Sequence, residues 1–170
     1  MIKAVFFDLG DTLISEEGVG GVSLRKAKLE KVPHVDSVLG KLKEKYRLGL
    51  ITNTTTSREE DVRWALHKIG IVEYFDVIVT SVDAESRKPD ERIFQIALDA
   101  IGVKATEAVM IGNRILRDVL GGNKMGMKTI LFRWNERYPD RVTSPQERPT
   151  RIIESLKDLP KVLEELEREF

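Results

Sequence analysis

The sequence predicts an α/β protein with a three-layer α/β/α arrangement, in which helices cover both faces of a parallel sheet. Five short apolar runs lack polar alternation, as strands buried on both faces do, and segments with helical apolar spacing fall between them. Strands that alternate with helices in this way predict βαβ units. The chain has 170 residues, of which 41% are hydrophobic, and no linker divides it. We therefore expect a single domain over residues 1–170.

The expected strands are the apolar runs at 3–7, 48–52, 76–80, 109–111 and 129–132. Four helices are expected at 35–42, 57–69, 93–101 and 158–170, each with an apolar stripe. Residues 57–60 (SREE) have a capping-box sequence, and Gly70 ends that helix. Pro160 suits the first turn of the last helix. Each helix thus has an apolar face that can pack on the sheet.

Composition excludes several classes of function. The absence of cysteine excludes thiol catalysis, cysteine-based metal sites and disulfides. The 28 Lys and Arg residues balance the 28 Asp and Glu residues, so we expect no general nucleic-acid binding. The apolar run at the N-terminus is too short for a signal peptide, and no stretch reaches membrane-spanning length, which favours a cytoplasmic protein without membrane partners. The 33% of charged residues and the lack of cysteine are thermophile tendencies.

Polar side chains follow four of the predicted strands at their carboxyl ends, where ligands bind in open parallel sheets. They comprise carboxylates, hydroxyls, amides and a lysine. In chain order they are Asp8, Asp11 and Thr12, then Thr52 and Asn53, then Ser81, Asp83 and Lys88, and finally Asn113, Arg114 and Asp118. The sequence therefore predicts a polar site at this edge.

Four segments that contain these polar residues resemble, in order, the motifs of the haloacid dehalogenase-like hydrolases. They are residues 6–13 (FFDLGDTL), 51–53 (ITN), 88–90 (KPD) with Ile93 and Phe94, and 110–113 (MIGN) with Asp118. The resemblance covers about residues 1–132 and implies a doubly wound, Rossmann-type sheet. It also implies a magnesium-dependent phosphatase that acts through an aspartyl phosphate, in which a carboxylate attacks phosphorus and water then hydrolyses the acyl phosphate.

The resemblance also implies roles for individual residues. Asp8 is the expected nucleophile, Thr52 bonds a phosphate oxygen, and Lys88 holds nucleophile and phosphate together. The expected substrate-binding residues are Thr52, Asn53 and Lys88, and the expected Mg²⁺ ligands are Asp8, the carbonyl of Gly10, Asp118 and Asn113. Hard oxygen ligands of this kind are what Mg²⁺ prefers.

Two positions depart from the family pattern. The second Asp of the usual Asp-x-Asp motif, which protonates the leaving group, is replaced by Gly10, and the next acid is Asp11. A shift of one residue moves a carboxylate by about 3.5 Å and turns it, so Asp11 is a poor substitute. The fourth motif has Asn113 where Asp is usual, which removes a negative charge. We therefore expect weaker Mg²⁺ binding.

The chain also leaves little room for the cap domain that family members usually carry. The 13–34 segment offers at most a short flap at 15–32. Capless relatives often act on large phosphorylated substrates or assemble into oligomers. The resemblance therefore implies a large phosphorylated substrate and a homo-oligomer, and we expect both. Two other functions remain open: an inactive protein that binds phosphorylated ligands, and a haloacid dehalogenase. The arginine-rich segment 133–151 is either plain surface or a loop that faces substrate or a subunit.

Overall fold

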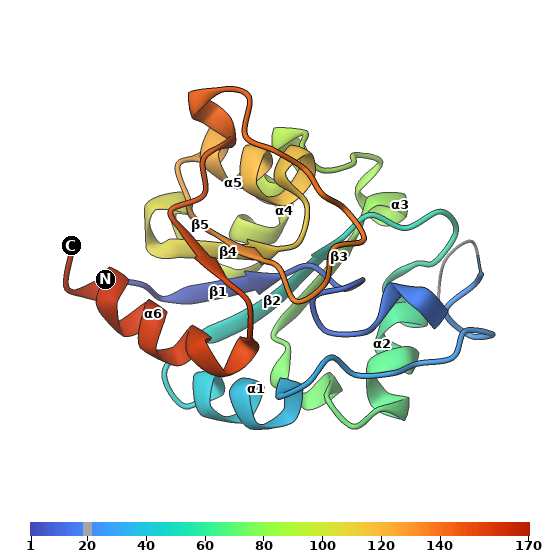
Figure 1. The fold of residues 1–170 in the computed structure, drawn as a ribbon. Coiled ribbons are helices and arrows are strands. Elements are labelled where there is room, and N and C mark those ends of the chain that lie inside the picture. Colours follow the sequence, from blue (N-terminus) through green and yellow to red (C-terminus); the bar gives the residue numbers. More distant parts are fainter. Residues whose placement is uncertain (19–21) are drawn as a thin grey trace.

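The computed structural model describes residues 1–18 and 22–170, and its centre is one six-stranded parallel sheet (Figure 1). The strand order is β3-β2-β1-β4-β5-β6. The strands are β1 Ala4–Phe7, β2 Arg47–Thr52, β3 Val77–Thr80, β4 Ala108–Gly112, β5 Lys128–Phe132 and β6 Arg151–Ile153. The chain runs outward from β1 in both directions, so the sheet is doubly wound, as predicted.

Helices cover both faces of the sheet, which confirms the three-layer arrangement. Below the sheet in Figure 1 lie α1 (Val35–Lys43), α2 (Glu59–Lys68) and α6 (Leu159–Glu167); above it lie α4 (Glu91–Ile101) and α5 (Leu120–Met125). Alternate residues of β1 face opposite layers: Phe7 packs in the core with α1, α2 and α6, and Phe6 packs in the core with α4. This two-sided burial explains why the strands lack polar alternation.

Shorter elements connect these layers. The four-residue helix α3 spans Ser81–Ala84, and a π-helix, η4, spans Ile115–Val119. The 3₁₀ turns are η1 Glu16–Gly18, η2 Val72–Tyr74, η3 Ala105–Glu107, η5 Pro145–Glu147 and η6 Leu156–Asp158. Among the described helices, none is both long and apolar enough to cross a membrane.

Three local features differ from the sequence-based expectations. Helix α2 begins at Glu59, and the capping pair joins the Asp61 carboxylate to the Arg58 N–H at 3.0 Å, one residue later than predicted. Strand β6 was not predicted, because it has three residues at the sheet edge and only Ile153 is buried. Helix α5 was not predicted because it contains Gly121 and Gly122. A Cβ at Gly121 would lie 2.3 Å from the Phe94 ring, so close packing on α4 explains that glycine.

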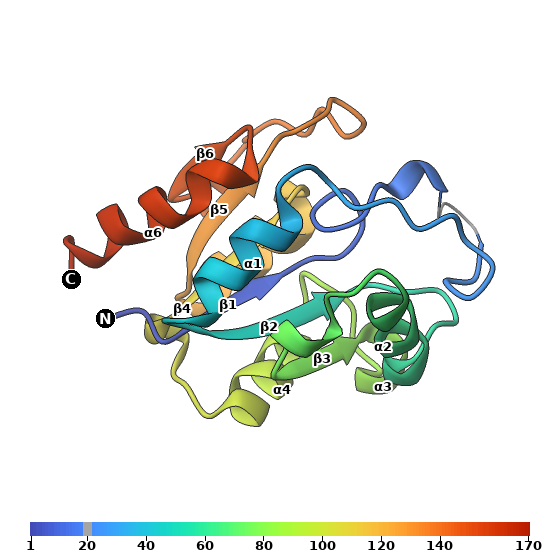
Figure 2. The ribbon, with the colours of Figure 1, turned by 90° about the horizontal axis from the view of Figure 1, so that it is seen from below.

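The chain between β1 and α1 lies at the carboxyl ends of the strands, opposite the two termini (Figure 2). Asp11 has a left-handed backbone conformation (φ 53°), and the turn is followed by η1. In the segment 15–32, where a flap was expected, residues 19–21 lie outside the described residues. The flap and the single-domain boundary stay predictions.

Candidate active site

The candidate site lies where the central strands β1, β2 and β4 end. Asp8 follows β1 and donates its backbone N–H to the Ile111 carbonyl of β4 at 2.9 Å. Thr52 is the last residue of β2, and Gly112 is the last residue of β4. Because parallel strands end at one edge, these residues lie side by side, as the sequence predicted.

Lys88 joins three elements of the site. Its ammonium donates to Asp8 Oδ1 at 2.8 Å, to Asp118 Oδ1 at 2.6 Å and to the Ile51 carbonyl of β2 at 2.8 Å. The side chains of Lys88 and Asp118 are each 1% exposed, and that of Asp8 is 13% exposed. Three acceptors match the three protons of the ammonium, so Lys88 is fixed in one orientation.

Burial and mutual charge shift the pKa values of this cluster. Burial alone would lower the pKa of Lys88, but the carboxylates of Asp118 and Asp8 outweigh it and raise that pKa. The pKa of Asp118 is raised to about 6, chiefly by burial and further by Asp8, while Lys88 acts in the opposite direction. The cluster therefore places the Lys88 cation between two carboxyl groups.

Asp118 approaches the strand so closely that only glycine fits beside it. A Cβ added at Gly112 would lie 2.1 Å from Asp118 Cγ. The second oxygen of Asp118 accepts the backbone N–H of Arg114 at 3.1 Å. Gly112 thus has a steric function in the site, since a larger residue would displace the carboxylate that Lys88 contacts.

The side-chain amide of Asn53 contacts the backbone of Lys88. The Lys88 N–H donates to Asn53 Oδ1 at 2.8 Å, and Asn53 Nδ2 donates to the Lys88 carbonyl at 3.1 Å. This pair holds the segment that presents Lys88. Substrate binding by Asn53 stays a prediction, and its amide already has a positioning role.

A cavity of about 50 Å³ lies over the cluster. It is lined by most of the predicted site residues, namely Asp8, Gly10, Thr52, Asn53, Lys88 and Asn113. Arg114, which the sequence placed at this edge without a role, also lines it, and three further lining residues were not predicted: Glu16, Arg117 and Tyr138. Arg114 stacks over the Tyr138 ring at 4.0 Å from its centroid, so the segment 133–151 reaches the site. Three cationic side chains, those of Lys88, Arg114 and Arg117, line this small polar cavity and favour an anionic ligand.

Asp11 is buried and its carboxylate is fully engaged away from the cavity. One oxygen accepts the Glu16 N–H at 2.9 Å, and the other pairs with Arg137 Nε at 2.7 Å. Its carbonyl accepts the indole N–H of Trp134 at 2.8 Å. Asp11 therefore ties the turn after β1 to the segment after β5, which supports the expectation that it does not replace the missing acid.

Glu16 is a half-buried carboxyl in the same cavity. Burial raises the pKa of Glu16, and the negative charges of Asp11 and Asp8 raise it further. The hydrogen bond with Tyr138 and the positive charge of Arg137 lower this pKa, but by less. Glu16 also lines a second, adjoining cavity of about 270 Å³ with Gly10, Thr52 and Asn53. No sequence signal marked Glu16, because only the left-handed turn at Asp11 brings it back to the strand ends.

The family model of haloacid dehalogenase-like hydrolases matches residues 21–132 of the sequence. A glyceraldehyde 3-phosphate phosphatase of Methanothermobacter thermautotrophicus is 36% identical over 132 residues, which are 77% of this chain and 57% of that protein. This chain is a haloacid dehalogenase-like hydrolase. The expected family membership is thus confirmed.

Two other proteins show how far the likeness extends. A pyrophosphatase of Bacillus cereus is 31% identical over 126 residues, which are 74% of this chain and 56% of that protein. The chain therefore spans a little over half the length of these curated relatives. An uncharacterized protein from Listeria monocytogenes serotype 4b, known from a crystal structure, is 28% identical with a TM-score of 0.88. That comparison covers 98% of this chain and 99% of the other.

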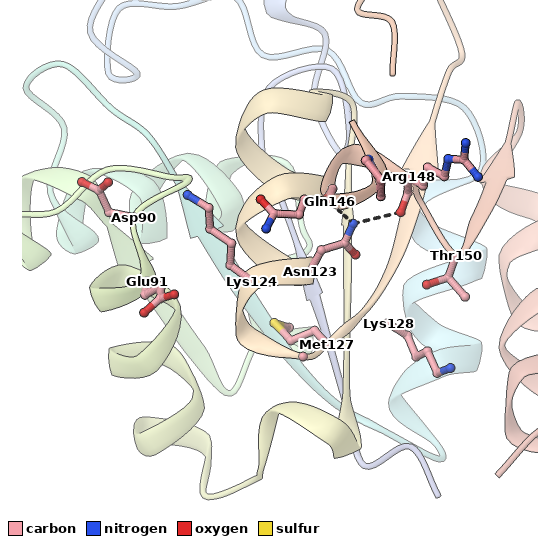
Figure 3. Close-up of a pocket in the computed structure, with 11 residues that line it drawn as sticks. Asp90, Glu91, Asn123, Lys124, Met127, Lys128, Gln146, Arg148 and Thr150 are labelled. Carbon is pink, nitrogen blue, oxygen red and sulfur yellow. Dashed lines mark hydrogen bonds between the residues drawn. The ribbon is translucent and has the colours of Figure 1, made fainter. Parts of the chain in front are cut away.

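A larger cavity of this haloacid dehalogenase-like hydrolase, of about 930 Å³, lies elsewhere (Figure 3). It is lined by parts of α4 and α5, the start of β5 and the segment before β6. Asn123 closes one wall by donating to the carbonyls of Gln146 at 2.7 Å and Arg148 at 2.9 Å. This cavity shares no described residue with the site around Asp8. The cavity at Asp8 is smaller, but it is the candidate active site because carboxylates and a lysine converge there.

The donor set at the smaller cavity fits a hard divalent cation. Asp8 supplies a carboxylate at the cavity wall, and Asp118, which is not among the residues that line the cavity, shares Lys88 with Asp8. Asn113 Oδ1 is buried without a hydrogen-bond partner in the described part of the chain. A buried amide oxygen without a partner is costly unless a cation or water meets it. Oxygen ligands and a cavity with room for water match the preference of Mg²⁺.

Proposed function

We propose that this protein is a Mg²⁺-dependent phosphomonoesterase that acts through an aspartyl phosphate on Asp8. The contact of Lys88 with both Asp8 and Asp118 at the strand ends carries this proposal. The ammonium holds one oxygen of Asp8 in place. The same cation lies where it reduces the repulsion between a carboxylate and a phosphate dianion.

The protein's residues divide the work of the first step. Asp8 attacks phosphorus while Lys88 fixes its orientation, and the Thr52 hydroxyl at the end of β2 donates to a phosphate oxygen. Arg114 and Arg117, which line the cavity, add positive charge around the phosphate. The buried walls of β1, β2 and β4 limit the access of water to the acyl phosphate.

The residues that would hold Mg²⁺ are Asp8, Asp118, Asn113 and the Gly10 carbonyl. Bound there, Mg²⁺ would neutralise phosphate charge and polarise the phosphoryl group. Asn113 supplies a neutral oxygen where relatives usually have a carboxylate, so we expect weaker metal binding than in a site with three carboxylates.

The substrate class follows from the relatives and from the second cavity. The relatives are named for a sugar-type monophosphate and for pyrophosphate, and both cavities of this chain meet at Gly10, Glu16, Thr52 and Asn53. A phosphate in the small cavity would thus place its leaving group in the larger one. Its walls combine the hydroxyls of Thr54, Thr55 and Thr56 with apolar side chains. A large substrate that extends beyond this cavity and a homo-oligomer stay predictions.

Hydrolysis of an aryl phosphate tests the proposal. We expect turnover that requires Mg²⁺ and is abolished in Asp8→Asn, which keeps the shape of the side chain but removes the nucleophile. Asp36→Asn, at an exposed position on α1, serves as a control. Unchanged activity in Asp8→Asn would overturn the nucleophile assignment.

A second candidate, a protein that binds phosphate without turnover, is favoured by Gly10 and Asn113, where family carboxylates are absent. Measurable phosphate binding at Asp8, without turnover of any phosphate ester, would identify this function instead.

A further inference from the structure

The structure holds a carboxyl group close to where the missing second Asp of the first motif would lie. The three atoms nearest to a Cβ added at Gly10 all belong to the side chain of Glu16: Cδ at 3.6 Å, Cγ at 3.6 Å and Cβ at 3.8 Å. An Asp side chain at position 10 would therefore enter the space beside the Glu16 carboxyl. Gly10 and Glu16 lie six residues apart in sequence, but they share one corner of the site.

Glu16 is held in this corner by a buried anchor. The Asp11 carboxylate accepts the Glu16 N–H at 2.9 Å with one oxygen and pairs with Arg137 at 2.7 Å with the other. The Asp11 side chain is fully buried, so these contacts are shielded from water. Asp11, the acid that follows Gly10, is thus a positioning residue, because it fixes the backbone of Glu16 and with it the place of the Glu16 side chain in the cavity.

Glu16 also lies where the two cavities join. It lines the small cavity together with Asp8 and Lys88, and it lines the adjoining cavity that would receive the leaving group. The bond that breaks in a phosphate ester joins the phosphoryl group to the leaving-group oxygen. A side chain at the junction of the two cavities is therefore placed beside that oxygen.

We propose that Glu16 is the general acid and base of this enzyme, in place of the missing Asp of the first motif. This inference rests on the proposed phosphatase function. In the first step Asp8 forms a bond to phosphorus, the bond to the leaving oxygen breaks, and that oxygen takes the proton of the Glu16 carboxyl. In the second step the Glu16 carboxylate takes a proton from water as the water oxygen attacks phosphorus. The bond to Asp8 then breaks, and inorganic phosphate and the Asp8 carboxylate are released.

Substrates that differ in leaving group separate the role of Glu16 from that of Asp8. Nitrophenolate leaves without a proton, so in Glu16→Gln we expect kcat/KM for nitrophenyl phosphate to stay within about threefold of wild type. An alkyl leaving group needs the proton, and kcat/KM for alkyl phosphates should fall by about 10²- to 10⁴-fold. Because the second step also needs a base, nitrophenyl phosphate should give a burst of one equivalent of nitrophenol followed by slow turnover.

Glu17→Gln is the matched control. Glu17 is the next residue of the same 3₁₀ turn, is exposed, and is not among the described residues that line either cavity. Glu17→Gln should keep the wild-type ratio of alkyl to aryl kcat/KM and show no burst. Urea denaturation of both variants checks that the fold is intact.

Moving the carboxyl to the family position gives a second, independent test. Gly10 has no left-handed backbone conformation, and the Cβ contacts would be ordinary van der Waals contacts. In Gly10→Asp/Glu16→Ala the new carboxyl enters the space that Glu16 leaves. We expect alkyl phosphate turnover to recover at least tenfold relative to Glu16→Ala alone.

The outcomes distinguish this inference from the proposed function. A wild-type protein that is inactive on every phosphate, or an active Asp8→Asn, would overturn the phosphatase proposal and with it the role of Glu16. Equal losses on aryl and alkyl kcat/KM in Glu16→Gln, without a burst, would overturn only the acid–base assignment. In that case Glu16 would be a structural residue of the turn.

Discussion

Replacing Lys88 by Met should destabilise the protein strongly, because it removes the only cation that contacts Asp8 and Asp118 among the described ion pairs. Met keeps most of the side-chain volume, so the cavity left behind is small. The lost contacts are three hydrogen bonds of 2.6–2.8 Å from a side chain that is 1% exposed. Removing one partner of a buried ion pair typically costs about 3–5 kcal/mol, and we expect a loss of that size in the free energy of unfolding at pH 8.

The loss should depend on pH in a defined direction. The pKa of Asp118 is raised to about 6 in the folded wild type from its ordinary value of 3.8. A carboxyl with a raised folded-state pKa contributes stability that is complete below its unfolded pKa and is lost as pH rises through its folded pKa. Without Lys88 the pKa of Asp118 rises further, so the loss continues above pH 6 at up to about 1.4 kcal/mol per pH unit. The deficit at pH 5 should therefore be smaller than at pH 8 by at least about 1 kcal/mol.

Urea denaturation followed by tryptophan fluorescence at pH 5 and pH 8 measures both quantities. Lys41→Met, which replaces an exposed lysine of α1, should change the free energy of unfolding by less than about 0.5 kcal/mol at either pH. A deficit for Lys88→Met below about 1 kcal/mol at pH 8, or equal deficits at both pH values, would refute the electrostatic account of the cluster.

Three further predictions concern the metal site and its close packing. Gly112→Ala should displace Asp118, lower the free energy of unfolding by about 1–3 kcal/mol and weaken Mg²⁺ binding. Gly40→Ala in α1, whose added Cβ would make ordinary van der Waals contacts, should not destabilise the protein. Equal thermal stability of the two variants would contradict this prediction. Asn113→Asp should tighten Mg²⁺ binding by about 1 kcal/mol in calorimetric titration, and equal affinities would place Asn113 outside the electrostatic reach of the metal. Because Asp118 must ionise to bind metal, Mg²⁺ affinity should rise with pH up to about 6 and level off above it; identical affinity at pH 5 and pH 8 would exclude Asp118 as a ligand.

The predictable part of the site is the part that strand ends position. Asp8 and Thr52 were predicted because each follows an apolar run, and parallel strands place their ends at one edge. Lys88 comes from the turn before α4 and Asp118 from the π-helix η4, so their approach to Asp8 could be expected only from the resemblance to the family motifs. The structure confirms that they meet, at 2.6–2.8 Å.

The unpredicted part depends on tertiary contacts without a local signal. Glu16 reaches the site because Asp11 adopts a left-handed conformation and its carboxylate accepts the Glu16 N–H. Tyr138 reaches the site because its neighbour Arg137 pairs with Asp11 across 126 residues of sequence. The η4–α5 region was missed because its glycines have low helix propensity and are explained only by the close approach of the α4 helix.

Chemical trapping of the phosphoryl group tests the central claim most directly. Enzyme turning over an aryl phosphate with Mg²⁺ is quenched in acid, reduced with borohydride and mapped by peptide mass spectrometry. An acyl phosphate on Asp8 is reduced to an alcohol, so the account predicts homoserine at position 8 and unmodified side chains at Asp11, Glu16 and Asp118. A reduced residue at any of those three positions, or complete hydrolysis by an enzyme in which Asp8 is never modified, would contradict it.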